Sequence, residues 1–476
     1  MKLEIFNEPE LEFGKNTHLC PRAGISQFGV YDTRLATRRT NIHVGAVGIS
    51  DDLDKLAQWL DRCKRPIPGK AETNQPELFP AFCGFNSEVG YKAEIIFQQE
   101  ITRSINLSEV RTILKTKNWN EKVNLAVELF YRHIKFLAQN RPVDVVICVI
   151  PDSLYKDISK EEIQSDEPTL DGSEDEDKKD VQEINFRRAL KAKIMHLGKP
   201  TQLIISKSLD TNAPGRQDDA TKAWNFSTAL YYKANQTVPW KLVSNLNRPS
   251  VCFVGIGFYR SRDKKMLHTS LAQIFDELGN GVILRGTPVL LKDDRVPHLS
   301  HEQSYDLLCL ALDEYNTAMD TSPARLVIHK SSNFNEDEIE GFREATQQMR
   351  VNAVDYVTIM DSNLKLFRDG IYPPYRGTHV ELDESTHLLY TRGSVAYYRT
   401  YPGKYIPQSL EVRIVESDES PGQVCREILG LTKMNWNNTQ FDQKYPITLG
   451  CARKVGQIMK YVPEDEQPQI RYSFYM

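Results

Sequence analysis

The sequence lacks the patterns that usually reveal metal clusters, disulfide frameworks and membrane spans. Its eight cysteines are scattered without a CxxC pair, so neither a zinc cluster nor a disulfide set is predicted. We expect reduced, mostly buried thiols. No apolar run approaches the roughly 18 residues that a membrane-spanning helix needs, so no membrane partner is expected. The first residues lack the features of a secretory signal, which predicts a cytoplasmic protein.

Common catalytic signatures are also missing. The chain has no GxxxxGK(S/T) phosphate loop, no HExxH metal helix and no GxSxG nucleophile elbow. Gly255-Ile256-Gly257 resembles the start of a dinucleotide fingerprint, but the third glycine of that pattern is replaced by Arg260. The sequence therefore does not predict a dinucleotide site.

The net charge of −4 hides an uneven distribution. Between Lys156 and Glu183, 12 acidic and 4 basic residues give a local charge of −8, which leaves the rest of the chain mildly basic. Such a segment has little to bury and repels itself, so we predict a disordered surface insertion at about 156–183. Mimicry of nucleic acid is the less favoured alternative.

Alternating helices and strands predict an α/β protein of two domains. Residues 1–40 are rich in turn formers and are expected to form an extended lead-in. In the first domain, 41–240, the apolar run from Val143 to Ile150 is typical of a buried parallel strand. The second domain, 241–476, has predicted strands at 251–258, 282–284, 326–329, 356–360, 387–391, 395–399 and 410–415.

Four residues of the first domain form a basic constellation. Arg187 and Lys191 are four apart on a predicted helix and so share one face, Gln202 begins the next strand, and Lys233 lies on the following helix. The arginine fork and the lysine ammonium both suit phosphate oxygens, so these residues could bind a terminal phosphate. By charge alone, a solvated basic helix face is the favoured alternative.

Several segments of the second domain resemble a known family. They are Tyr398 to Gly403, Leu431 to Asn438, Pro446 to Leu449, Thr269 to Phe275, Gly281 to Gly286 and the terminal Arg471 to Met476. Together they resemble the carboxy-terminal part of a PIWI domain and cover most of residues 250–476. The preceding half then resembles a MID domain. A chain this short has no room for the amino-terminal and PAZ domains of long Argonautes, so the match is to short prokaryotic Argonautes.

The resemblance implies a Rossmann-like MID domain followed by an RNase H-like PIWI domain, and it gives the basic constellation a role. In the family, residues at similar spacing bind the 5′-phosphate of a guide. Arg187, Lys191 and Gln202 match the offsets, and Lys233 matches with a slightly longer gap. The family's carboxy terminus folds into this pocket, which implies that the terminal carboxylate of Met476 helps to hold Mg²⁺ against the phosphate.

The same resemblance implies that the protein does not cleave its target. A slicing PIWI domain holds two metal ions with clustered carboxylates. The corresponding positions here are Gly257, Asn280, Ser331 beside Lys330, and Arg453. The alternative is a guided nuclease with a displaced metal site, for which the nearby acids are Asp263, Asp276 and Glu336.

If the protein does not cleave its target, its expected function is to bind guide and target nucleic acid. Basic residues near the opening of the PIWI sheet are expected to contact guide or target backbone, although each could be an ordinary surface charge: Arg260, Arg262, Lys264, Lys265 and Arg285. Three aromatic residues could stack on a terminal base or pack in the core at the domain seam: Tyr231, Tyr232 and Trp240.

For short Argonautes, the resemblance implies an RNA guide and a complementary single-stranded DNA target. It also implies a partner chain with an APAZ region fused to a sirtuin-like or TIR effector that degrades NAD, which gives abortive defence against plasmids or phage. Target binding would favour an active assembly of the partner, with a higher oligomer as one form. A protein scaffold with a vestigial nucleic-acid groove is a further alternative.

Overall fold

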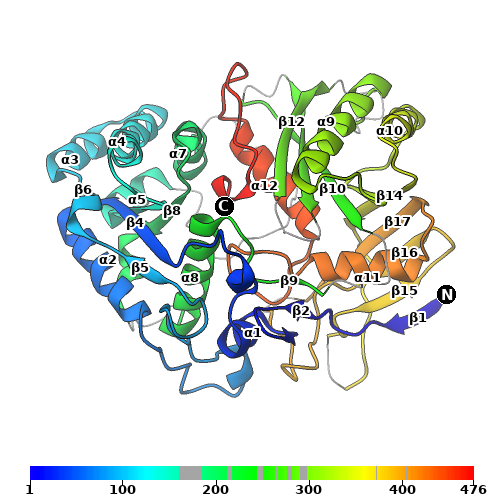
Figure 1. Cartoon of the computed structure of the whole chain (residues 1–476), viewed down its shortest axis with the longest axis horizontal. Coiled ribbons are helices and arrows are strands. Elements are labelled where there is room, and N and C mark those ends of the chain that lie inside the picture. Colours follow the sequence, from blue (N-terminus) through cyan, green and yellow to red (C-terminus); the bar gives the residue numbers. More distant parts are fainter. Residues whose placement is uncertain are drawn as a thin grey trace.

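Two lobes lie side by side in the computed structural model (Figure 1). The structure describes residues 1–159, 184–211, 217–243, 250–262, 266–275, 281–289, 297–370, 373–403 and 406–476. Most of the predicted acidic insertion lies outside these residues. In the described part of the chain, no helix is both long and apolar enough to cross a membrane.

The first lobe is built on a parallel sheet. Within the described residues, its strand order is β5 (Glu94–Ile96), β4 (Asn41–Gly48), β7 (Val145–Ile150) and β8 (Thr201–Ile205), and β6 (Thr102–Ser104) pairs with β4. Every residue of β7 is buried, as expected for a parallel strand that is covered on both faces. This strand was predicted from its apolar run.

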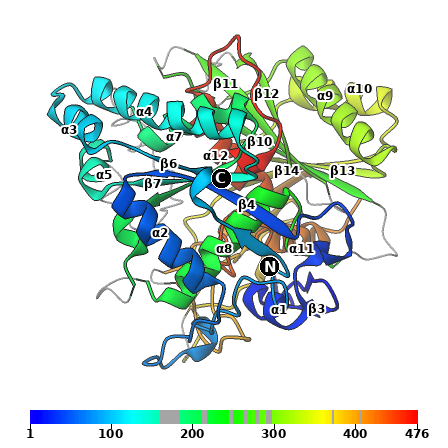
Figure 2. The same cartoon turned by 60° about the vertical axis from the view of Figure 1, so that its left-hand side comes forward.

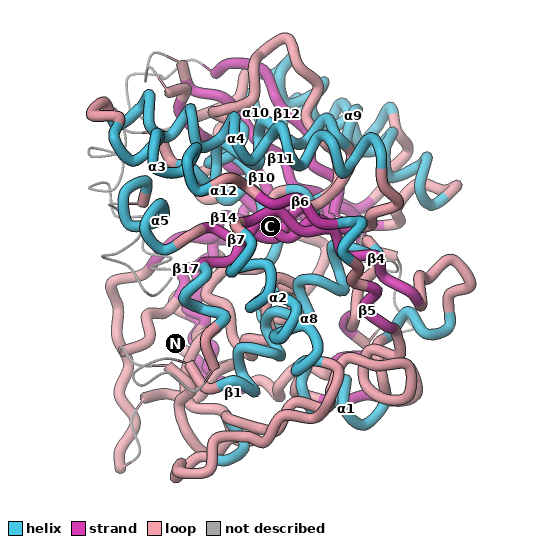
Figure 3. The backbone as a smooth tube through the Cα atoms, turned by 90° about the vertical axis from the view of Figure 1, so that its left-hand side faces the viewer, coloured by secondary structure: helices cyan, strands magenta, loops and turns pink. Residues whose placement is uncertain are grey.

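Helices cover both faces of this sheet (Figure 3). One face packs against α2 (Ser50–Cys63) and α8 (Asp219–Asn235). The other face packs against α3 (Leu107–Lys115), α4 (Trp119–Asn140), α5 (Asp152–Ile158) and α7 (Phe186–Ile194). Alternate residues of β7 enter the two cores, because side chains of a strand point to opposite faces. The doubly wound, Rossmann-like arrangement is therefore confirmed.

The second lobe has an RNase H-like core, also as predicted. The strands β10 (Val251–Arg260), β11 (Leu267–Phe275) and β12 (Gly281–Val289) form an antiparallel meander. On its other side, β10 pairs in parallel with β13 (Arg325–Lys330), which pairs in parallel with β14 (Ala353–Asp361). The sheet continues in the order β17 (Leu410–Glu416), β16 (Thr386–Leu389), β15 (Thr378–Glu381) and β1 (Lys2–Ile5).

Four helices of the described chain cover the two faces of this sheet. On one face, α9 (His301–Met319) and α10 (Glu336–Gln348) pack against alternate residues of β10 and β13. On the other face lie α11 (Pro421–Leu431) and α12 (Ile447–Met459). The core beneath α12 is continuous with the core beneath α8, so one apolar cluster joins the two lobes. Short 3-10 turns occur at Tyr31–Arg34, Pro76–Leu78, Gln99–Ile101, Met195–Leu197, Ser206–Leu209 and Tyr472–Phe474.

Residues 1–40 hold more structure than the extended lead-in that was predicted. They contain a helix, α1 (Pro21–Phe28), and the short strands β2 (Leu11–Glu12) and β3 (Thr17–His18), which form a small sheet with β9 (Lys241–Leu242). The turn formers are compatible with α1, since Pro21 lies in its first turn. Gly24 allows close packing, because a Cβ there would lie 2.1 Å from the Phe13 ring.

The strand predicted at 395–399 is wrong. These residues form turns closed by hydrogen bonds from Tyr398 N to Val395 O at 3.1 Å and from Arg399 N to Ala396 O at 3.1 Å. Arg399 has a φ of 54°, in the left-handed region, which a strand does not allow. The domain boundary near residue 240 stays a prediction.

Candidate functional site

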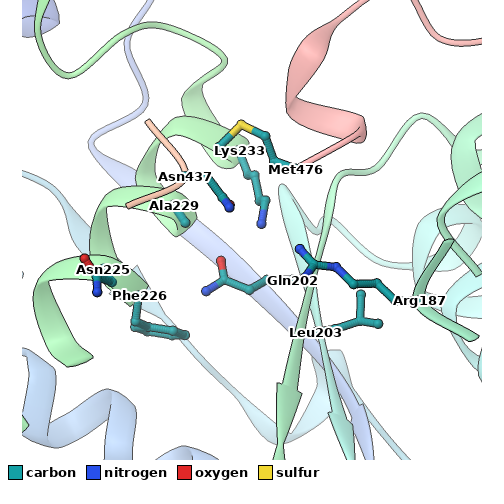
Figure 4. Close-up of a pocket in the computed structure, with 9 residues that line it drawn as sticks. All are labelled: Arg187, Gln202, Leu203, Asn225, Phe226, Ala229, Lys233, Asn437 and Met476. Atoms are coloured by element: carbon teal, nitrogen blue, oxygen red, sulfur yellow. The ribbon is translucent and has the colours of Figure 1, made fainter. Parts of the chain in front are cut away.

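A pocket of about 180 Å³ lies where α7, β8 and α8 meet the end of the chain. Arg187, Gln202, Lys233 and Met476, all predicted from the sequence, line this pocket together with Leu203, Asn225, Phe226, Ala229 and Asn437. Figure 4 shows Arg187, Gln202 and Lys233 extending toward the same space, with Met476 above them. In Figures 1 and 2, the carboxy terminus lies between the lobes.

Three elements of the first lobe deliver these side chains. Arg187 is in the first turn of α7, which begins after the cap Asn185, whose side chain accepts from Arg188 N at 3.0 Å. Gln202 follows Thr201 at the start of β8. Lys233 lies in the last turn of α8. The predicted helix, strand and helix are therefore present, and their ends converge on one pocket.

Lys191 lies behind the pocket and does not line it. It is 1% exposed, and its Nζ donates to Thr201 O at 3.2 Å. Gln202 and Lys233 are also buried, whereas Arg187 is exposed at the rim. Of the four predicted phosphate ligands, three therefore reach the cavity directly, and Lys191 lies behind them.

Burial makes the positive charge of this site costly. It lowers the pKa of Lys191 well below its ordinary value, and the charges of Lys233 and Arg187 lower it further. Burial and Arg187 lower the pKa of Lys233 to about 7. In the part of the chain that the structure describes, no Asp or Glu side chain offsets either shift. Buried cations without a counter-ion are unstable on their own and suit an anionic ligand.

A fourth cation was missed in the sequence. Lys454 of α12 has its pKa lowered by burial, with a smaller effect from Arg187. It belongs to the second lobe, so both lobes contribute charge to this region. The sequence did not indicate this lysine, because the residue spacing that predicted the phosphate site involves residues of the first lobe alone.

The pH dependence of stability is expected to report the buried charge of Lys233. Its folded pKa of about 7 lies below the ordinary 10.5, so the folded state binds fewer protons than the unfolded state. The cost is fully present below about pH 7 and fades as the pH rises toward about 10.5. Lys233→Gln should therefore raise the melting temperature most at about pH 6 and least at about pH 9. A difference that does not change with pH in thermal unfolding would contradict this.

The pocket has oxygen atoms that would suit a divalent cation beside a bound phosphate. Gln202 Oε1 is buried and has no hydrogen-bond partner in the described structure, so it is a vacant acceptor. Met476 lies at the same pocket. In the described residues, no group of three or more His, Cys, Asp and Glu side chains could hold a metal ion. The surrounding cations would repel Mg²⁺ unless phosphate oxygens neutralised them.

The three aromatic residues proposed for base stacking pack in the core instead, as the alternative interpretation expected. Tyr231 is fully buried and its OH donates to Asp32 Oδ1 at 2.6 Å. Tyr232 packs against the Trp436 ring at a centroid distance of 5.1 Å. Trp240 is buried at the seam, and its Nε1 donates to Lys433 O at 3.0 Å.

The predicted backbone-binding residues of the second lobe have different surroundings. Arg260 and Arg262 are exposed, and the Arg262 guanidinium lies 5.1 Å from the Tyr461 ring centre. Arg285 is engaged within the protein, since its Nη1 donates to Pro463 O at 3.0 Å. Lys264 and Lys265 lie outside the described residues. Arg260 and Arg262 therefore remain candidates for binding the nucleic-acid backbone, whereas Arg285 hydrogen-bonds to a backbone carbonyl of the protein itself.

The positions that would hold slicing carboxylates carry other groups where the structure describes them. Gly257 lies on β10, and Arg453 packs on the Tyr445 ring at 4.0 Å. At the end of β13, Lys330 forms a fully buried ion pair with Glu338 at 2.6 Å. Ser331 follows this lysine. Glu336 is exposed at the start of α10, and Asn280, Asp263 and Asp276 lie outside the described residues.

Sequence reasoning missed several residues that line the pocket. Asn225 Oδ1 accepts from Thr439 N at 3.0 Å and from Thr439 Oγ1 at 2.9 Å, which fixes its orientation across the lobe interface. Asn437 comes from the second lobe, within the segment that carried the PIWI resemblance. That resemblance could have pointed to Asn437, whereas nothing in the sequence indicated that Asn225 or Phe226 lines the pocket.

Comparisons with known proteins agree with this architecture. No family model and no curated protein matches the sequence. Among solved structures, Clostridium butyricum Argonaute bound to a guide DNA and a 19-mer target DNA matches with a TM-score of 0.67 and 16% identity, over 99% of this chain and 54% of that one. Drosophila Piwi matches with a TM-score of 0.59 and 14% identity, over 99% and 56%.

Marinitoga piezophila Argonaute in complex with 5′ OH guide RNA matches with a TM-score of 0.59 and 12% identity, over 100% of this chain and 59% of that one. This chain therefore spans little more than half the length of the structures that it matches. At these identities the likeness shows the fold. The chain has an Argonaute-like fold, in which a Rossmann-like MID domain is followed by an RNase H-like PIWI domain.

Proposed function

We propose that the protein holds a 5′-phosphorylated guide RNA and uses it to recognise complementary single-stranded DNA. The pocket carries this proposal, because Arg187, Gln202 and Lys233 converge there and no acidic side chain is among the described residues that line it. The Clostridium butyricum neighbour is bound to guide and target DNA, and the Marinitoga piezophila neighbour to a 5′ OH guide RNA. These neighbours support guide binding, and the charge of the pocket favours the phosphorylated end.

In this proposal, each pocket residue has a defined part. The Arg187 fork and the Lys233 ammonium donate to phosphate oxygens, and the Gln202 amide adds a neutral donor. Lys191, which is buried behind them, raises the local potential. The protein then recognises the end and backbone of the guide, while base pairing supplies the sequence specificity.

A divalent cation is part of the same proposal. Gln202 Oε1 and the terminal carboxylate of Met476 would hold Mg²⁺ beside the phosphate. The ion would supply a further positive charge that neutralises phosphate oxygens. The residues themselves orient the phosphate and exclude water from its buried side.

We further propose that this subunit does not slice its target and instead signals to an APAZ-containing sirtuin-like or TIR partner in the cytoplasm. Target pairing would then switch on NAD degradation by the partner, as a defence against plasmids or phage. The buried Lys330–Glu338 pair supports the absence of slicing, because the Lys330 ammonium stands at the end of β13, where a slicing site would need a carboxylate, and it neutralises Glu338 of α10. Consumption of NAD by the two-chain complex on adding complementary DNA tests this role.

One gel experiment tests guided recognition and the absence of cleavage together. The protein is loaded with a 5′-phosphorylated RNA and given labelled complementary or scrambled DNA with Mg²⁺. We expect retention of the complementary strand at full length, with at least about tenfold weaker retention of the scrambled strand. Cleaved DNA would favour a guided nuclease, and loss of cleavage in Glu336→Gln would locate its metal site. Equal retention of both strands would favour the scaffold alternative.

A further inference from the structure

The last residues of the chain reach the phosphate pocket by a long path. After α12 ends at Met459, the carboxy-terminal tail (residues 460–476) forms an exposed loop at 463–467 and then returns to the interior. Residues 472–476 are buried, and Met476 is 2% exposed at the pocket. The exposed loop thus precedes the buried segment that brings Met476 to the pocket.

Strand β12 holds the tail where it leaves α12 and where it returns. Arg285 Nη1 donates to Pro463 O at 3.0 Å, and its Nη2 donates to Val462 O at 3.2 Å. Two residues earlier in β12, Ile283 N donates to Ile470 O at 2.6 Å. The arginine fork suits this task, because its donors lie in one plane and can reach neighbouring carbonyls together.

Further contacts connect the returning tail to the first lobe. Gln469 Nε2 donates to Met195 O at 3.2 Å, just after α7, and Arg471 hydrogen-bonds to Gln236 at the end of α8. Within the tail, Tyr475 OH donates to Gln469 O at 2.7 Å. These contacts attach the tail to Arg285 on one side, and on the other to the residues that directly follow the helices supplying Arg187 and Lys233.

We propose that Arg285 is a positioning residue for the 5′-phosphate pocket and acts through the carboxy-terminal tail. This inference rests on the proposed function. It replaces the sequence-based prediction that Arg285 contacts nucleic acid directly, because two of its donor nitrogens already bind tail carbonyls. Its Nε is buried and has no partner in the described structure, so that nitrogen is also closed to a ligand from solvent.

The test compares affinities of the full chain for one RNA with a 5′-phosphate or a 5′-hydroxyl at a single salt concentration. In Arg285→Ala we expect the phosphate preference to fall at least about fivefold, while affinity for the hydroxyl RNA stays within about twofold. Hydrogen exchange at 469–476 should rise. Arg285→Lys should restore part of the preference, since one ammonium can reach one carbonyl at a time.

Arg343→Ala is the matched control, because it removes an equal charge from α10, where Arg343 pairs with Glu416 on the surface. It should change neither affinity. Tyr475→Phe removes a tail contact without changing charge, and it should lower the phosphate preference even if Arg285→Ala does not fold.

Three outcomes overturn the inference. One is an equal loss for both RNAs in Arg285→Ala with a weaker salt dependence, which is the pattern of a direct backbone contact. Another is a preference that survives in both Arg285→Ala and Tyr475→Phe. The third is unchanged hydrogen exchange in the tail. A wild-type protein without any phosphate preference would instead sink the proposed function, and tail exchange would still test the anchoring by Arg285.

Discussion

Replacing Arg187 and Lys233 together with glutamine is expected to weaken binding of 5′-phosphorylated RNA by about a hundredfold or more. The reason is that two charge-assisted hydrogen bonds are lost, each worth roughly 1.5–3 kcal/mol. Both residues line the cavity, so both lose direct contact with the phosphate. Lys191→Gln should have a smaller effect, because Lys191 lies behind the cavity and donates to Thr201 O.

The double variant should remain folded, because it removes the buried ammonium of Lys233 and the Arg187 charge beside it, and both burial and Arg187 lower the pKa of Lys233. Thermal unfolding checks this, and fluorescence anisotropy with labelled RNA measures the affinity. Lys193→Gln is the matched control, because Lys193 lies on the same helix and pairs with Glu128 outside the pocket. Wild-type affinity in the double variant would show that the phosphate binds elsewhere.

Lys330→Ala is expected to lower the free energy of unfolding by about 3–5 kcal/mol, because it leaves the Glu338 carboxylate buried without its cation. Both side chains are 0% exposed, and Lys330 Nζ lies 2.6 and 2.7 Å from the two carboxylate oxygens. Glu338 also completes the capping box of α10 with Asn335, so the loss should loosen the start of that helix.

Chemical denaturation measures this effect. The double variant Lys330→Met, Glu338→Leu removes both charges and should lose less than Lys330→Ala. A loss below about 1 kcal/mol in Lys330→Ala would mean that Glu338 is satisfied without the lysine. If added Mg²⁺ restored the stability of Lys330→Ala, the site would be a metal position filled by an ammonium group.

The sequence predicted the elements of the site better than their surroundings. The strand β7 could be predicted because a strand buried on both faces has an uninterrupted apolar run. The helix, strand and helix that carry Arg187, Gln202 and Lys233 could be predicted from local sequence patterns. Arg285 could not be assigned, because its partner Pro463 is 178 residues away and the contact is to a backbone carbonyl. Such a contact leaves no pattern in the side chains.

Other differences also have physical causes. Val395 to Arg399 is rich in residues that favour strands, yet the left-handed φ of Arg399 turns the chain. Asn225 reaches the pocket through a contact with Thr439, 214 residues away across the lobe interface. Local propensity describes neither, because the first is the backbone conformation of one residue in a turn and the second is a contact between the two lobes.

Recognition of a 5′-phosphate by the pocket can be tested by the affinity of the wild-type chain for one RNA with a 5′-phosphate or a 5′-hydroxyl. Both should be measured at the same salt concentration, since backbone contacts depend on salt. We expect the phosphorylated RNA to bind at least about tenfold more tightly, or about 1.4 kcal/mol. Equal, weak binding of both RNAs would contradict end recognition and leave a protein scaffold as the better account.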